Sequence, residues 1–142
     1  MANNSYEAQD FIMNTNVEQK IYGDNAGEIY YAAVEELNRL ENMMSFYRDT
    51  SEVSLLNRRV GQEVVTLSNE MMLILAQAKH YSSLSKNAFN IMISPLIQLW
   101  RKAGRENELP SNEDLERALA LCDSDNLFLD TDNHTAFLKK KG

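Results

Sequence analysis

The stretch NAFNIMISPLIQLW, residues 87–100, decides how the rest of the chain is interpreted. Ala88 and Phe89 place a small residue beside an aromatic ring, a combination that could hold a flat ligand. Asn90 follows with a short side chain that offers both a hydrogen-bond donor and an acceptor. The first part of the stretch therefore predicts a loop suited to binding a ring system.

The second part of the stretch changes direction at Pro95. The proline fixes its own φ and pushes Ser94 away from the α region. Leu96, Leu99 and Trp100 then recur at helical spacing, which indicates an apolar helix face. Taken alone, this part is equally typical of a helix that starts at a proline and packs on a core.

Composition sets the broad class of the protein. The chain has 142 residues, enough for one domain with a sizeable core, and 44% are hydrophobic, which argues against disorder. The net charge is −7, and Lys139–Lys141 is its one basic cluster. A nucleic-acid-binding surface needs a basic stripe, so we expect no nucleic-acid partner.

Sequence signals also bear on location. The start, MANNSYEAQDF, has neither a basic nor an apolar segment of the kind found in secretory or lipoprotein signals. No apolar run approaches the roughly 20 residues that span a bilayer. Cys122 is the single cysteine, so it predicts no internal disulfide and no zinc cluster. We expect a cytoplasmic protein with no membrane span.

The first third of the chain predicts a strand, a turn and a long helix. Residues 11–22 alternate as a strand does. Gly23–Asn25 is a turn, and Asn25 with Glu28 fits a capping box for a helix that ends near Met44. The helix has an apolar stripe and an acidic face, which we interpret as solvated. The stripe contains Ile29, Ala33, Leu37, Leu40 and Met44, and the acidic face contains Glu28, Glu35, Glu36 and Glu41.

The remaining elements interleave without a regular βαβ rhythm. Capping patterns at Asp49/Glu52, Ser68 and Ser111/Asp114 predict three helices, the second over residues 69–84. The other expected elements are strands at 63–67, 126–129 and 135–138, the last two forming a hairpin, and a polar loop at 101–110. The fold class that this order predicts is α+β, with mixed helices and antiparallel strands.

Three segments in order resemble motifs of the FAD:protein FMN transferases, the ApbE family. Met13-Asn14-Thr15 is similar to the family's M-G-T. Residues 45–57, SFYRDTSEVSLLN, are similar to S-x-Y followed by S-E-x-S-x-L-N. Residues 87–100 are similar to G-A-F-D, P-L and L-W. The likeness extends over nearly the whole chain from Phe11 onward.

The resemblance implies an FAD site. The matching positions are Met13, Tyr47, Ala88, Phe89 and Asn90. A methionine adapts to a ring edge, and tyrosine and phenylalanine offer stacking faces. Core packing is the alternative for Met13 and Phe89 taken singly.

Three asparagines depart from the family pattern. Asn14 replaces a glycine and adds a Cβ where close backbone approach could be needed. Asn90 replaces an aspartate, so it keeps hydrogen-bonding geometry but carries no charge. Asn87 replaces the glycine before Ala88, which is tolerable if its φ is positive, because asparagine visits the left-handed region readily.

The family's D-L-G-G and K-G segment, and the later aspartate and threonine that bind magnesium, have no counterpart before Gly142. The resemblance therefore implies an incomplete ApbE-like domain at residues 11–142, after a tail at residues 1–10. The aspartates at 123, 125, 130 and 132 have spacing typical of turns, so we assign no metal ligand and no catalytic residue.

Two functions follow from the resemblance. The first is magnesium-dependent transfer of FMN from FAD to a serine or threonine of an acceptor flavoprotein, for which this chain alone would not suffice. The second is a non-catalytic flavin-binding or interaction module, or a truncated family remnant that keeps the fold. Because an incomplete core leaves a strand edge and an apolar face open, we expect either self-association or a complementary second half as partner.

Overall fold

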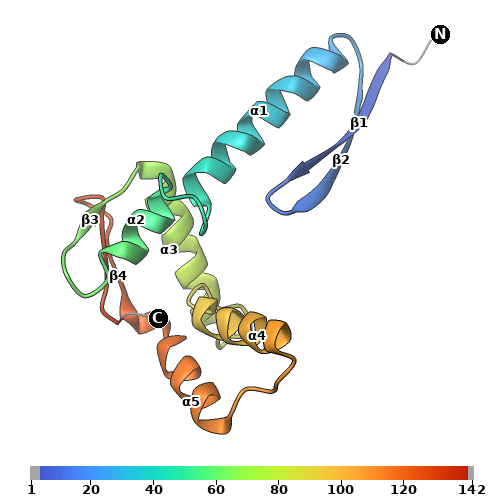
Figure 1. The fold of residues 1–142 in the computed structure, drawn as a ribbon. Coiled ribbons are helices and arrows are strands. Elements are labelled where there is room, and N and C mark those ends of the chain that lie inside the picture. The colour runs from blue at the N-terminus through green and yellow to red at the C-terminus, as the bar shows by residue number, and fades with distance from the viewer. Residues whose placement is uncertain (1–3, 141–142) are drawn as a thin grey trace. The chain divides into compact units, whose positions relative to one another are not determined.

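The computed structural model describes residues 4–140 and divides into two compact units, Met1–Ser54 and Leu55–Gly142. The chain combines helices with antiparallel strands in runs and not in regular alternation, which confirms the predicted α+β class (Figure 1). None of the helices formed by residues 4–140 is long and apolar enough to cross a lipid bilayer.

The first unit begins with a β-hairpin. β1 (Ser5–Ile12) pairs antiparallel with β2 (Thr15–Tyr22), in a register that sets Ile12 opposite Thr15. The predicted single strand over residues 11–22 is therefore wrong, because a two-residue turn interrupts it. Alternation cannot distinguish one strand from two strands joined so tightly. Residues 5–10 of the expected tail belong to β1, and residues 1–3 lie outside the described part.

Helix α1 (Ala26–Met44) follows the hairpin and confirms the predicted long helix. Asn25 occupies the N-cap in a left-handed conformation with φ 62°, and its side chain makes no capping hydrogen bond. The predicted capping box with Glu28 is therefore wrong. A left-handed backbone differs from the extended one that a capping side chain requires.

Tyrosines hold α1 against the hairpin. Tyr30 is buried, its ring centroid lies 4.8 Å from that of Tyr6, and its hydroxyl donates to the Asp10 carboxylate. This bond, made to the protonated phenol, raises the pKa of Tyr30 to about 12. Ile29, predicted to face inward, is 51% exposed. The buried face of α1 thus includes Tyr30, a residue that a pattern of apolar positions does not select.

The boundary at which the chain divides into the two units falls within helix α2 (Glu52–Arg58). Its start at Glu52 makes Ser51 the N-cap, in place of the predicted Asp49. The Ser51 hydroxyl accepts a 3.0 Å hydrogen bond from the backbone N–H of Ser54, which is the bond a capping serine makes.

The second unit contains a three-stranded antiparallel sheet in the order β3-β5-β4. The predicted strand at 63–67 shrinks to β3 (Val65–Thr66), whereas β4 (Leu127–Asp130) and β5 (Thr135–Leu138) form the predicted hairpin. The 3₁₀ turn η1 (Ser124–Asn126) leads into β4. The hairpin turn is closed by Asp130, whose carboxylate accepts the backbone N–H groups of Asp132 and Asn133.

Helix α3 (Asn69–Leu84) is confirmed at both ends, with Ser68 as its N-cap. It contacts β4 and η1. Much of the core of this unit is made of buried residues from α3 and from the sheet. They are Met71, Met72, Leu75, Val65, Leu127, Ala136 and Leu138.

Two further helices pack on each other. α4 (Ser94–Glu106) extends into the predicted loop at 101–110, and α5 (Asn112–Leu121) starts after the predicted cap at Ser111. The loop prediction is wrong because arginine, lysine, alanine and glutamate favour a helix, and a single glycine at 104 does not end one. Asn107, left-handed with φ 53°, terminates α4.

Candidate functional site

A cavity of about 420 Å³ lies in the first unit, at the end of α1. The tip of the β1–β2 hairpin supplies one part of its lining, and the last turns of α1 with the loop that follows supply the rest. The lining residues are Met13, Asn14, Glu41, Met44, Ser45, Phe46, Tyr47 and Arg48. The cavity thus brings together Met13 and Tyr47, two residues that the sequence motifs predicted for one site.

Met13 reaches the cavity through an unusual backbone. Met13 and Asn14 have φ of 52° and 61°, so the hairpin turn has the two left-handed residues of a type I′ turn. Asparagine tolerates this conformation, whereas methionine adopts it rarely. The Met13 side chain remains 40% exposed. An unfavourable backbone that exposes an apolar side chain is a feature associated with function.

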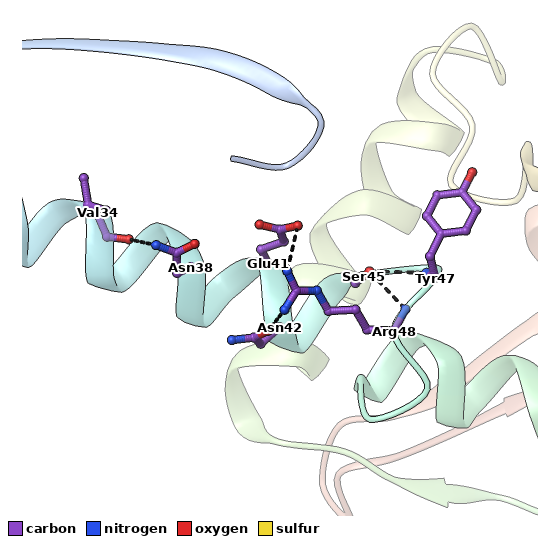
Figure 2. A network of polar contacts seen from close by, with 7 residues as sticks. All are labelled: Val34, Asn38, Glu41, Asn42, Ser45, Tyr47 and Arg48. Carbon is purple, nitrogen blue, oxygen red and sulfur yellow. Dashed lines mark hydrogen bonds and ion pairs between the residues drawn. The ribbon is translucent and has the colours of Figure 1, made fainter. Parts of the chain in front are cut away.

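The loop after α1 is shaped by Ser45. Its hydroxyl oxygen accepts hydrogen bonds from the backbone N–H groups of Tyr47 and Arg48, each at 3.2 Å (Figure 2). A serine that bonds to the backbone two and three residues later fixes a local turn. Tyr47 is therefore presented by a defined turn.

Two buried serines close the base of the same turn. The hydroxyl of Ser51 donates to the carbonyl of Ser45, and that of Ser54 donates to the carbonyl of Phe46 at 3.0 Å. These bonds satisfy two backbone carbonyl groups of the loop that directly follows α1. The serines of the S-E-x-S motif thus act on the backbone that carries Tyr47.

The Tyr47 ring itself is 63% exposed. It meets the Phe46 ring nearly edge to face, with centroids 5.2 Å apart and an interplanar angle of 77°. Because so much of the ring faces solvent, core packing, the alternative for an aromatic residue, does not describe Tyr47. An exposed ring beside a cavity can stack on a flat ligand.

Arg48 extends from the loop back to α1. Its guanidinium forms an ion pair with Glu41 at 3.3 Å and donates to the side-chain oxygen of Asn42 (Figure 2). Glu41, which we predicted to be on a solvated acidic face, instead lines the cavity and is only 24% exposed at its side chain. That prediction is wrong because it considered α1 without the loop that folds over its last turn.

The second unit contains the other three predicted residues, Ala88, Phe89 and Asn90, in the loop between α3 and α4. Lys86 and Asn87 have φ of 53° and 64°. The condition set for Asn87, a positive φ, is therefore met. The Ser85 hydroxyl accepts the Phe89 backbone N–H at 3.0 Å and holds the loop to the end of α3.

Phe89 lies at a shallow, apolar cavity of about 320 Å³, together with Tyr81, Leu84 and Ser85. Its side chain is 51% exposed, and Ala88 beside it is also exposed. The exposure excludes Phe89 from the core of the described structure. An apolar ring in the wall of an open cavity leaves a face for a ligand.

Asn90 is partly buried and uses both ends of its amide. Its nitrogen donates to the backbone carbonyl of Cys122 at 2.6 Å, and its oxygen accepts the backbone N–H of Met92 at 2.8 Å. The side chain therefore stabilises the loop from within the unit. The family aspartate could not supply the donor to Cys122 while ionised.

Residues 4–140 contain no group of three or more His, Cys, Asp or Glu side chains placed to hold a metal ion. The carboxylates of Asp123 and Asp130 accept backbone N–H groups of their own turns. The pKa of Asp130 is lowered chiefly by the hydrogen bond from the Asn133 side chain.

Sequence motifs located Met13 and Tyr47 but missed the residues that arrange them. Arg48 and Glu41 meet across a helix end, where neither helical nor strand periodicity applies. Ser51 and Ser54 were visible in the S-E-x-S motif, yet their targets, the carbonyls of Ser45 and Phe46, depend on how the loop folds.

Comparisons with known proteins agree with the motifs. The sequence profile of the ApbE family matches residues 13–142. The chain is 30% identical over 106 residues to a FAD:protein FMN transferase from Klebsiella pneumoniae (strain 342), an alignment covering 75% of this chain and 34% of that protein. It is 25% identical over 122 residues to a FAD:protein FMN transferase from Treponema pallidum (strain Nichols), covering 83% and 34%.

A solved structure extends the likeness to the fold. The ApbE protein from Thermotoga maritima superposes with a TM-score of 0.88 at 27% identity, over 97% of this chain and 46% of that one. The chain thus spans about a third of the two transferases and about half of the solved structure.

Proposed function

The chain belongs to the ApbE family, and from this premise we propose that it forms part of the flavin-binding surface of an FAD:protein FMN transferase. Met13 and Tyr47 are the residues proposed to contact FAD in the first unit. Ala88 and Phe89 are the corresponding residues in the second. Asn90 has a supporting role, because its amide is occupied by backbone groups.

One observation carries the proposal. Met13 and Tyr47 come from separate family motifs, on a hairpin tip and on a loop after α1, and both line one cavity. A polarizable thioether and an exposed aromatic face are suited to the edge and the plane of a flavin ring. A purely structural pair would bury these side chains, but both remain exposed.

The proposed reaction is protein flavinylation. The hydroxyl oxygen of an acceptor serine or threonine attacks the phosphorus of the FMN half of FAD. A new P–O bond forms, the bond to the oxygen of the AMP half breaks, AMP leaves, and the hydroxyl proton is lost. The charge that develops on the diphosphate needs a cation, which magnesium would supply.

We propose that this chain alone does not complete the reaction. Residues 4–140 present no three-residue metal group, and the chain spans about a third of the transferases it matches. The acceptor flavoprotein, magnesium and the remainder of the family domain would then be the partners. FAD is its substrate and not a resident cofactor.

The second candidate function is non-catalytic flavin binding. It is favoured by Asn90, where an amide that is committed to Cys122 and Met92 stands in place of the family carboxylate. In this case the cavity would bind FAD with no transfer in any assembly.

Self-association is a further expectation. β4 lies at an edge of the sheet, and its Phe128 is exposed. Such an edge can pair with another chain. The ammonium of Lys79 donates to the Leu127 carbonyl at 2.5 Å, so this carbonyl of the edge strand is less available to a second chain. Light scattering of the purified chain measures the outcome, and a clean monomer would contradict the expectation.

Titration of FAD against the purified chain tests flavin binding. We expect quenching of flavin fluorescence in the micromolar range, and Tyr47→Ala should weaken binding by about 3- to 10-fold, the range of an aromatic contact. Tyr22→Ala is the matched control, since Tyr22 is a similarly exposed tyrosine of the same unit. No binding at high micromolar FAD would remove both flavin-dependent functions and leave a structural remnant of the family.

A transfer assay separates the two candidates. The chain is mixed with FAD, magnesium and an acceptor flavoprotein, and covalent flavin is detected by in-gel fluorescence. We expect no transfer by the chain alone. Transfer that appears when the remainder of a family domain is added supports the transferase, and its continued absence supports the non-catalytic module.

A further inference from the structure

We propose that Arg48 is a positioning residue for the flavin site, acting through Glu41 and Asn42 to hold the turn that presents Tyr47. This inference rests on the proposed function, because it concerns the same cavity. Nothing in the sequence motifs assigns a role to any of these three residues.

Arg48 is tethered at both ends. Its backbone N–H donates to the Ser45 hydroxyl at 3.2 Å, and its guanidinium bonds Glu41 at 3.3 Å and the side chain of Asn42 (Figure 2). Both side-chain partners belong to the last turns of α1. The loop residue is therefore attached to the helix through its main chain and again through its side chain.

Tyr47 lies between these attachments. Its own backbone N–H donates to the Ser45 hydroxyl. The next residue, Arg48, is fixed by its side-chain contacts with Glu41 and Asn42, which we call the clasp. Fixing the backbone on both sides leaves mainly side-chain torsions free. A ring held in this way loses less conformational entropy when a ligand stacks on it.

The carboxylate partner of Arg48 is less exposed than that of a comparable surface pair on α1. The Glu41 side chain is 24% exposed, compared with 55% for Glu36, which pairs with Arg39 on the same helix. Exposed ion pairs contribute little because solvent screens them. The guanidinium also presents several donors in a rigid plane, so it can bond Glu41 and Asn42 at once, which a lysine ammonium does less well.

The clasp also shapes the cavity. Glu41 and Arg48 line it together with Met13 and Tyr47. Opening the clasp would release the loop from the side of the cavity that α1 provides. Both the orientation of the Tyr47 ring and the shape of the cavity therefore depend on this ion pair.

The first test is independent of any ligand. Amide hydrogen exchange is measured at Tyr47 and Arg48 in the full chain, without flavin, for wild type, Arg48→Gln and Glu41→Gln. We expect exchange at these two amides to become about 3- to 10-fold faster in both variants. Arg39→Gln is the matched control, because it removes an ion pair of α1 that lies outside the cavity. Unchanged amide exchange in Arg48→Gln would contradict the claim that the clasp holds this turn.

The second test uses FAD as the probe. We expect Arg48→Gln and Glu41→Gln each to weaken FAD binding by about 2- to 5-fold, and the double variant to be no weaker than the poorer single variant. Such non-additivity identifies residues that act through one contact. Arg39→Gln should bind FAD like the wild type.

Other results would contradict the positioning role. If Arg48→Gln weakens binding while Glu41→Gln leaves it unchanged or improves it, the guanidinium contacts FAD directly. Additive losses would show that the two residues act separately. If the wild-type chain binds no FAD, the proposed function fails and the positioning role with it, while the exchange data still decide whether the clasp exists.

Discussion

The side-chain amide of Asn90 donates a 2.6 Å hydrogen bond to the backbone carbonyl of Cys122, and so joins the loop after α3 to the end of α5. The other end of the same amide accepts the Met92 backbone N–H at 2.8 Å. One contact needs a donor and the other an acceptor. An amide supplies the two from separate atoms, whereas an ionised carboxylate can only accept.

Asn90→Asp should therefore destabilise the chain, although it restores the family residue. At pH 7 the carboxylate would face the Cys122 carbonyl with no proton to donate, leaving a partly buried acceptor unpaired, which costs about 1–3 kcal/mol. Urea denaturation followed by circular dichroism measures the loss. Asn87→Asp makes the same chemical change at an exposed residue of the same loop. Equal stability of the two variants would contradict the assigned role of Asn90.

Local signals predicted most of the second unit. Ser68 and Ser111 mark helix starts that the structure confirms, and both hydroxyls accept the expected backbone N–H. The turn residues that start at Asp130 likewise predict the β4–β5 hairpin. These features depend on a few neighbouring residues, so the sequence contains the information directly.

The candidate site was only half predictable. Family motifs identify Met13 and Tyr47, and the structure places both at one cavity. The hairpin turn at Met13 was missed because methionine is a rare residue at positive φ, and Glu41 was misassigned because its partner Arg48 lies beyond the helix end. Contacts between elements leave no periodic signal in the chain.

The turn at Met13 predicts that a substitution can increase the stability of the chain while it weakens FAD binding. Met13→Asn should raise the free energy of unfolding by about 0.5–1 kcal/mol, because asparagine tolerates a left-handed backbone better than methionine does. The same variant should weaken FAD binding several-fold, since it removes the thioether from the cavity. Met13→Leu, which keeps an apolar side chain and the unfavourable backbone, should leave stability unchanged. A Met13→Asn variant that is no more stable would show that the turn is unstrained.

The Tyr30–Asp10 hydrogen bond predicts that the packing of α1 on the hairpin becomes less stable at alkaline pH. Donation to the carboxylate raises the pKa of Tyr30 from 10.0 to about 12. Folding therefore favours the protonated phenol, so this contribution is fully present below pH 10 and is lost as the pH rises towards 12. Denaturation at a series of alkaline pH values should show this loss in the wild type and not in Tyr30→Phe. Tyr22→Phe is the control, and an equal alkaline loss in Tyr30→Phe would contradict the assignment.

The N-cap of α5 predicts that the protein loses stability at acidic pH. The Ser111 hydroxyl accepts the Asp114 backbone N–H at 3.1 Å and donates to the Asp114 carboxylate at 2.7 Å. The latter bond is the largest cause of the lowered pKa of Asp114, with Arg117 adding to it. A lowered folded pKa gives stability that is present above the unfolded pKa and is lost as the pH falls through the folded one.

Ser111→Ala should therefore destabilise the chain most at neutral pH, by about 1 kcal/mol, the usual cost of losing a serine cap. The difference from wild type should narrow as Asp114 becomes protonated in acid, because part of what the serine contributes is a bond to the ionised carboxylate. Thermal unfolding at neutral and acidic pH measures both effects. Ser111→Thr keeps the hydroxyl and should behave like the wild type. If the difference between Ser111→Ala and wild type does not change with pH, the hydroxyl stabilises the backbone of α5 alone.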